Sequence, residues 1–122
     1  MAITLTLRSD KIIHVDATSI DVLGYKEFFE IADELRSFNK KYDTIFPCVI
    51  TAKEDVLIEH EFKGLIKSKF FNKYTLASAV ITNSDSQRLM VTIFARVAQL
   101  KSPIRSFKTK QKALIWLQQY AN

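Results

Sequence analysis

Ile45-Phe-Pro-Cys-Val-Ile-Thr51 is the stretch that decides the fold class, because it is a short and continuous apolar run. A run of this length predicts a central strand that is buried in a sheet. Pro47 has no backbone N–H, so we expect the beginning of this strand to be unpaired on one side. Residues 77–83, Ala-Ser-Ala-Val-Ile-Thr-Asn, predict a second buried strand.

Helical periodicity fills the segments around these two strands. Residues 22–38 and 56–72 carry apolar side chains three or four positions apart, which predicts two amphipathic helices. Ser84 begins a capping-box pattern, so we expect a third helix over residues 85–101. Thr109 is the expected N-cap of a last helix.

The ends of the chain complete the predicted order of elements. Residues 3–8 and 11–17 alternate between apolar and polar side chains around a Ser9-Asp10 turn, which predicts a hairpin, and residues 104–108 predict a short strand. We therefore expect one α/β domain over residues 1–122, with a mixed sheet of about five strands, about four helices and the order β-β-α-β-α-β-α-β-α.

Composition narrows the class of protein. The chain has 122 residues, and its single cysteine excludes an internal disulfide framework. No apolar run approaches the roughly 20 residues of a membrane-spanning helix. The charged and alternating N-terminus is unlike a signal peptide. We expect a cytoplasmic protein.

Catalytic and metal-binding patterns are missing from the sequence. His14 and His60 stand alone without a partner at metal-ligand spacing, and Cys48 lies within an apolar strand, where burial should raise its pKa and make it inert. Acidic residues cluster near the expected start of helix 56–72, and we interpret them as favourable partners of the helix dipole: Glu54, Asp55, Glu59 and Glu61. We expect no enzyme, no cofactor and no metal.

Charge is unevenly distributed between the two halves of the chain. Residues 1–61 carry 7 basic and 12 acidic side chains, and residues 62–122 carry 11 basic and 1 acidic, which gives −5 and +10. The candidate anion-facing residues are Arg88, Arg96, Arg105, Lys108, Lys110 and Lys112. Lys110 and Lys112 oppose the dipole of the last helix, which a sequence selected for stability alone would avoid. One interpretation of these lysines is charge for solubility together with sequence drift, and the other is an anion-facing surface. An acidic or phosphorylated partner, or an anionic membrane, suits this face, whereas no nucleic-acid-binding module is recognisable.

Helix 85–101 is apolar around nearly its whole circumference. A candidate apolar face consists of Leu89, Met90, Ile93, Phe94 and Val97. A neighbouring helix could cover this face, and the alternatives are a dimer interface, a pocket for a lipid-like ligand or a membrane contact.

The C-terminal two thirds of the chain resemble a known family. The motifs are Ala77-Ser-Ala-Val-Ile-Thr-Asn-Ser84, Gln87-Arg-Leu-Met90, Lys101-Ser-Pro-Ile-Arg-Ser-Phe107 and Ala113-Leu-Ile-Trp-Leu117. Over residues 45–120 these resemble small bacterial SpoIIAA-like proteins, often described as STAS-type domains. The resemblance implies a mixed sheet flanked by helices and no enzyme. Phospho-switch members have a serine after the central strand, whereas this sequence has Thr51-Ala-Lys-Glu-Asp55.

Two functional hypotheses follow. The first is a non-catalytic binding or regulatory module that acts through protein–protein contact, as a homodimer. The alternative is a carrier or sensor of a lipid-like or apolar anionic ligand, associated with the inner face of a membrane, with helix 85–101 as its lid.

Overall fold

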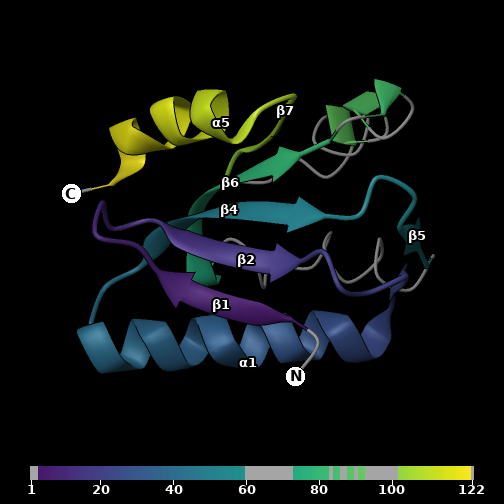
Figure 1. The fold of residues 1–122 in the computed structure, drawn as a ribbon. Helices are drawn as coiled ribbons and strands as arrows, with labels where there is room; N and C mark the ends of the chain where they lie inside the picture. Colours follow the sequence, from purple (N-terminus) through teal and green to yellow (C-terminus); the bar gives the residue numbers. More distant parts are fainter. Residues whose placement is uncertain are drawn as a thin grey trace.

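The centre of the molecule is a five-stranded sheet with the strand order β1-β2-β4-β6-β7 (Figure 1). This computed structural model describes residues 3–59, 73–82, 84–85, 88–89, 91–92 and 102–121. The strands of the sheet are β1 (Thr4–Leu7), β2 (Ile13–Ala17), β4 (Phe46–Ala52), β6 (Thr75–Ile81) and β7 (Ile104–Phe107). β1 is antiparallel to β2, and the remaining neighbours are parallel. The predicted mixed sheet of about five strands is confirmed.

β4 is a largely buried strand, as its apolar run predicted. Its first four residues are buried, and Ile13 of β2 is the partner of Cys48. Phe46 pairs only with Thr75 of β6, and the register between β4 and β6 shifts between Phe46 and Cys48. Pro47 therefore lies where one side of β4 is unpaired, which confirms the expectation from its missing N–H.

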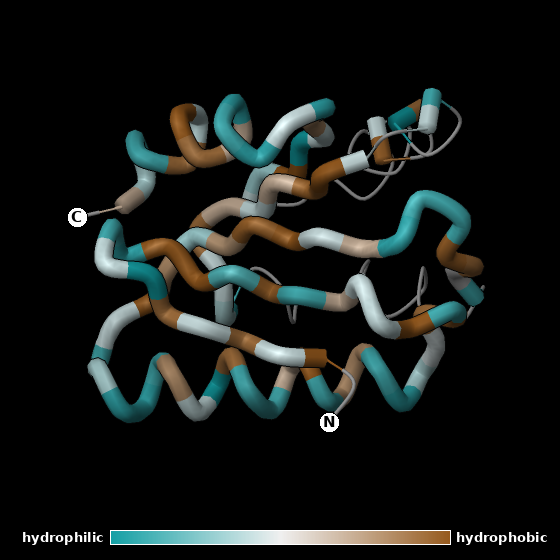
Figure 2. The backbone as a smooth tube through the Cα atoms, viewed as in Figure 1, coloured by the Kyte–Doolittle hydropathy of each residue, from teal (hydrophilic) through white to brown (hydrophobic). Residues whose placement is uncertain are grey.

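Two helices cover opposite faces of the sheet (Figure 1). α1 (Tyr25–Tyr42) buries Ile31 and Leu35 in one core cluster with residues of β2 and β4. α5 (Lys110–Leu117), which continues into a 3-10 turn (Gln118–Tyr120), buries Ala113 and Leu117 in a second cluster with residues of β4 and β6. Figure 2 shows hydrophobic residues along the central strands and hydrophilic residues in the loop after β4.

The first helix begins later than the apolar spacing predicted. Gly24 is the N-cap, and its N–H donates to Glu27 Oε1 at 3.0 Å. The two residues before it, which we assigned to a helix over 22–38, form the short strand β3 (Val22–Leu23) instead. The helix extends to Tyr42 and ends where Asp43 adopts φ 50°, a left-handed conformation that closes helices. The prediction was therefore wrong at both ends by a few residues.

The start of the predicted helix 56–72 was wrong. Leu57–Ile58 forms β5, a strand that pairs in parallel with β3. Backbone bonds fix this pairing, because Leu57 N donates to Asp21 O and Glu59 N donates to Leu23 O, each at 2.9 Å. A backbone partner distant in sequence overrode the local helical spacing. Residues 60–72 lie outside the described residues.

The acidic cluster must be reinterpreted with this strand. Glu54 and Asp55 occupy a turn between β4 and β5, in which Val56 N donates to Lys53 O at 3.2 Å. Glu59 follows β5, and Glu61 lies outside the described residues. Glu54 and Asp55 therefore lie in a turn and not at the start of a helix at residue 56, whereas the Glu59 carboxylate lies beside Gly24, at the N-terminus of α1.

The C-terminal elements agree with the sequence signals. Thr109 is the N-cap of α5, and its Oγ1 accepts a hydrogen bond from Lys112 N at 3.3 Å. Asp85, Arg88, Leu89, Val91 and Thr92 are helical, in the range where we expected helix 85–101, and residues 93–101 lie outside the described residues. Within the described ranges, no helix has both the length and the apolar character needed to cross a membrane.

Candidate functional site

Four cations of the predicted set come together where β7 joins α5. Arg105, Lys108 and Lys112 are exposed and Lys110 is half-buried. We call these four residues the basic surface. β7 is an edge strand of the sheet, and the first turn of α5 contains no acidic residue. That these four cations form one surface follows from their closeness in sequence and stays a prediction.

The basic surface takes no part in the ion pairs of the described residues. These pairs are Arg8–Asp10, Asp33–Arg36, Asp21–Lys53 and Asp85–Arg88. Instead, the Arg105 guanidinium lies 5.3 Å from the centre of the Phe107 ring. Within the described residues, no carboxylate lies at ion-pair distance from these four cations, although Lys110 interacts electrostatically with Asp16.

A polar part of the sheet lies beside the basic surface. α5 packs on β4, β6 and β7, on the sheet face where the alternation of β2 places His14 and Asp16. His14 Nε2 lies 3.0 Å from Thr51 Oγ1, which joins β2 to β4 through their side chains. Sequence reasoning missed this pair, although strand alternation was a usable signal for the face of each residue.

Lys110 of the basic surface interacts electrostatically with His14 and with Asp16. Burial lowers the pKa of His14, and the charge of Lys110 lowers it further, while Asp16 opposes the shift and Arg8 adds to it. The pKa of Asp16 is lowered by hydrogen bonds from the Thr18 hydroxyl and backbone N–H, with smaller contributions from His14 and Lys110. Lys110 therefore acts electrostatically on both groups.

His14 and Thr51 do not form a catalytic triad with Asp16. In a triad, a carboxylate orients the histidine that activates the hydroxyl. Here the Asp16 carboxylate accepts both of its hydrogen bonds from Thr18, and no bond between described residues joins it to His14. Glu54, Asp55 and Glu59 are not among the groups that shift the pKa of His14. No three metal-ligating side chains gather among the residues that the structure describes.

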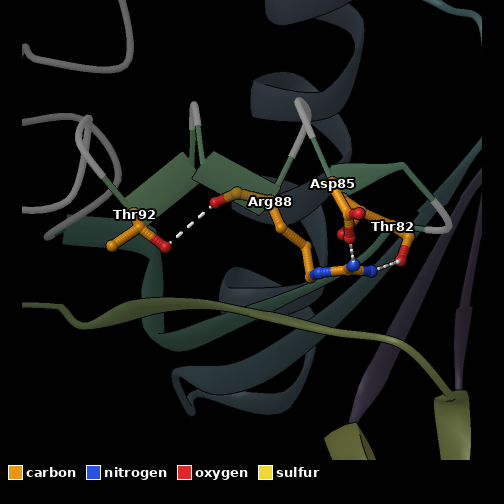
Figure 3. Close-up of polar contacts among 4 residues, drawn as sticks. All are labelled: Thr82, Asp85, Arg88 and Thr92. Carbon is orange, nitrogen blue, oxygen red and sulfur yellow. Dashed lines mark hydrogen bonds and ion pairs between the residues drawn. The ribbon is translucent and has the colours of Figure 1, made fainter.

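Arg88, unlike the four cations of the basic surface, forms an ion pair and a hydrogen bond with neighbouring residues. Its guanidinium pairs with Asp85 and donates from Nη1 to Thr82 O at 3.2 Å, while Thr92 Oγ1 donates to Arg88 O at 2.9 Å (Figure 3). These contacts hold the start of the helical segment after β6. Arg88 is therefore engaged within its own segment, unlike the basic surface.

Only one member of the predicted apolar face falls within the described residues. Leu89 is 60% exposed. The other members, Met90, Ile93, Phe94 and Val97, lie outside the described residues, as does Arg96. The apolar face thus stays a prediction.

Cys48 lies in the core, as its place in the apolar run predicted. It is 1% exposed, and burial raises the pKa of its thiol to about 12. A thiol that stays protonated at neutral pH is a poor nucleophile.

The comparisons with known proteins agree with the predicted SpoIIAA-like fold. The crystal structure of an uncharacterized protein of the DUF3478 family with a SpoIIAA-like fold, from Shewanella loihica PV-4, matches 94% of this chain and 91% of its own, with a TM-score of 0.67 and 16% identity. No curated protein matches the sequence. A family model described as a domain of unknown function, DUF7793, matches residues 5–121. The chain has the SpoIIAA-like fold and belongs to the DUF7793 family.

Proposed function

We propose that this protein is a non-catalytic binding module that acts through protein–protein contact, and that the basic surface receives an acidic segment of its partner. The observation that carries the proposal is the first turn of α5, which holds Lys110 and Lys112 and no acidic residue. Positive charge at this end of a helix is destabilising, and a gain elsewhere would offset this cost. An external anion supplies such a gain.

The form of the surface suits a macromolecular partner. Its four cations extend from the edge strand β7 into α5, and Ile115, which is 63% exposed, lies one turn beyond Lys112 on the helix. An exposed apolar side chain beside unpaired cations is typical of a protein interface with a charged rim. Association of two copies, the homodimer of the sequence analysis, is part of this proposal, as is a cytoplasmic location.

Binding of a defined acidic peptide tests the proposal. The probe is a labelled peptide that alternates glutamate with alanine, and fluorescence anisotropy measures its dissociation constant at low salt. Lys110→Glu/Lys112→Glu should weaken binding about tenfold or more, because attraction becomes repulsion. The matched control is Lys40→Glu/Lys41→Glu, which reverses two exposed lysines at the far end of α1. Equal losses in both variants, or no binding by the unmodified protein, would refute the proposal.

The alternative function, a carrier or sensor of a lipid-like ligand at a membrane, has one supporting observation. Leu89 is 60% exposed, as a residue that contacts an apolar ligand would be. Co-sedimentation with vesicles of phosphatidylglycerol, compared with phosphatidylcholine, tests it. Retention on the anionic vesicles that Leu89→Asp abolishes is the expected result, and absence of binding to either vesicle removes the alternative.

A further inference from the structure

The first half of α1 presents an exposed surface that is both acidic and aromatic. Residues 21–34 hold five acidic side chains and one basic side chain, a net charge of −4. Tyr25 is 59% exposed and Phe29 is 39% exposed, and their ring centres lie 4.7 Å apart. Together with Lys26, Glu30 and Asp33, these rings line a shallow depression on the helix. We call these five residues the acidic aromatic surface.

Further exposed apolar residues extend this end of the molecule. Val22 and Leu57 are partners in the β3–β5 pair, and β3 ends directly before the N-cap Gly24. Leu57 is 63% exposed. Isolated exposed leucines are ordinary in proteins, whereas neighbouring exposed aromatic and aliphatic residues mark a contact surface.

The opposite charge is found across the sheet. Residues 105–112 hold four basic and no acidic side chains, a net charge of +4. α1 and α5 cover opposite faces of the sheet, as Figure 1 shows. The two surfaces therefore cannot meet within one molecule, and a contact between them must join two molecules.

We infer that the acidic aromatic surface of one copy docks onto the basic surface of a second copy, so that copies associate head to tail. This inference rests on the proposed function, because it names a second copy of this chain as the partner. The segment 21–34, which contains the acidic aromatic surface, is acidic even though Asp21 and Asp33 are paired with Lys53 and Arg36, and the segment 105–112 is basic. Opposite charge favours this pairing over contact between identical surfaces. Lysines of the second copy would lie over the Tyr25 and Phe29 rings, where a cation is attracted to the ring face.

The geometry of such a contact sets the form of the assembly. Each copy keeps one surface of each kind free after the first contact, so association is heterologous. Mass then increases with concentration beyond the dimer, unless the rotation between copies closes a ring. Salt should weaken the assembly, since exposed charges carry the attraction.

Two variants with a change at one surface each test the inference. Tyr25→Ala/Phe29→Ala removes the rings without changing charge, and Lys110→Glu/Lys112→Glu reverses the other surface. Sedimentation velocity at low salt, up to roughly 0.3 mM protein, should show growing assemblies for the unmodified chain and monomers for each variant alone. A mixture of the two variants should form a one-to-one dimer and nothing larger, because one intact surface of each kind remains. Lys40→Glu/Lys41→Glu should assemble like the unmodified chain.

Several outcomes would overturn the inference. One is an unmodified chain that stays monomeric at this concentration and low salt. Another is a dimer that either variant leaves intact, since both surfaces are required. If the unmodified chain is monomeric yet its basic surface still binds the acidic peptide, the partner is a different protein and the proposed function stands. Fluorescence of Trp116, the only tryptophan in the chain, confirms that each variant is folded.

Discussion

Replacing Lys112 with glutamate should stabilise the fold while weakening the proposed partner contact. Lys112 is exposed in the first turn of α5, and its backbone N–H donates to the N-cap Thr109. The N-terminus of a helix carries a partial positive charge, which repels a lysine and attracts a glutamate. Thr109 and Glu at position 112 would also have the spacing of a capping box.

The magnitude follows from the charge–dipole interaction. The substitution removes an unfavourable contact and adds a favourable one, each of about 0.3–1 kcal/mol, so the free energy of unfolding should rise by about 1 kcal/mol. For a chain of this length the melting temperature should rise by about 4 °C. Lys112→Gln, which removes only the repulsion, should give about half the effect. Near 1 M salt, where the screening length is about 3 Å, most of the gain should disappear.

Urea unfolding, monitored by the fluorescence of Trp116, measures the change in the free energy of unfolding with a probe on the same helix as Lys112. Trp116 lies on α5 with its ring centre 5.5 Å from that of Phe107 and 5.4 Å from that of Tyr120. The same preparations are then tested for binding of the acidic peptide. An unchanged or lower free energy of unfolding at low salt would refute the claim that Lys112 is destabilising. Full retention of peptide binding would refute the claim that it is kept for an anion.

Three further predictions concern the core and the titratable groups. Leu117→Ala should lower the free energy of unfolding by about 3 kcal/mol, because Leu117 is 0% exposed against the sheet, and urea unfolding checks this; a loss under about 1 kcal/mol would mean that α5 is loosely packed. The pKa of His14 in the folded protein lies below its ordinary 6.5, so the unfolded chain takes up a proton first as the pH falls, and stability should decrease below about pH 6.5. His14→Gln should reduce the dependence of the free energy of unfolding on pH between about pH 7.5 and 5. An identical pH dependence in both proteins would contradict the shift. The Cys48 thiol should resist a thiol reagent at pH 8 in the native protein and react in guanidinium, so rapid native labelling would show that β4 is accessible.

Local patterns predicted the elements that local forces determine. The apolar run at residues 45–51 is β4, and the unpaired start of that strand follows from the missing N–H of Pro47. Thr109 caps α5 because its hydroxyl reaches the N–H of Lys112 three positions on. Each of these features depends on residues within one turn or one strand, so the sequence contains all the information required.

Patterns failed where a partner distant in sequence decided the outcome. The apolar spacing from residue 56 favours a helix, yet Leu57 pairs with Val22, 35 positions earlier. Val22 also fitted the apolar stripe of a helix, but it lies in β3, because Gly24 is the N-cap and α1 begins only at Tyr25. Helical spacing tests only a segment against itself, whereas a strand requires the backbone of another segment.

The candidate site divides in the same way. Arg105, Lys108, Lys110 and Lys112 are close in sequence, so the unusual charge at the start of α5 was determined by the sequence alone. The fold alone decided that His14 meets Thr51 and that Lys110 acts on both His14 and Asp16. It also decided that the −4 and +4 segments face away from each other, because α1 and α5 pack on opposite sides of the sheet. Charge is a property of each residue, but the direction in which it faces depends on which side of the sheet its helix buries its apolar stripe.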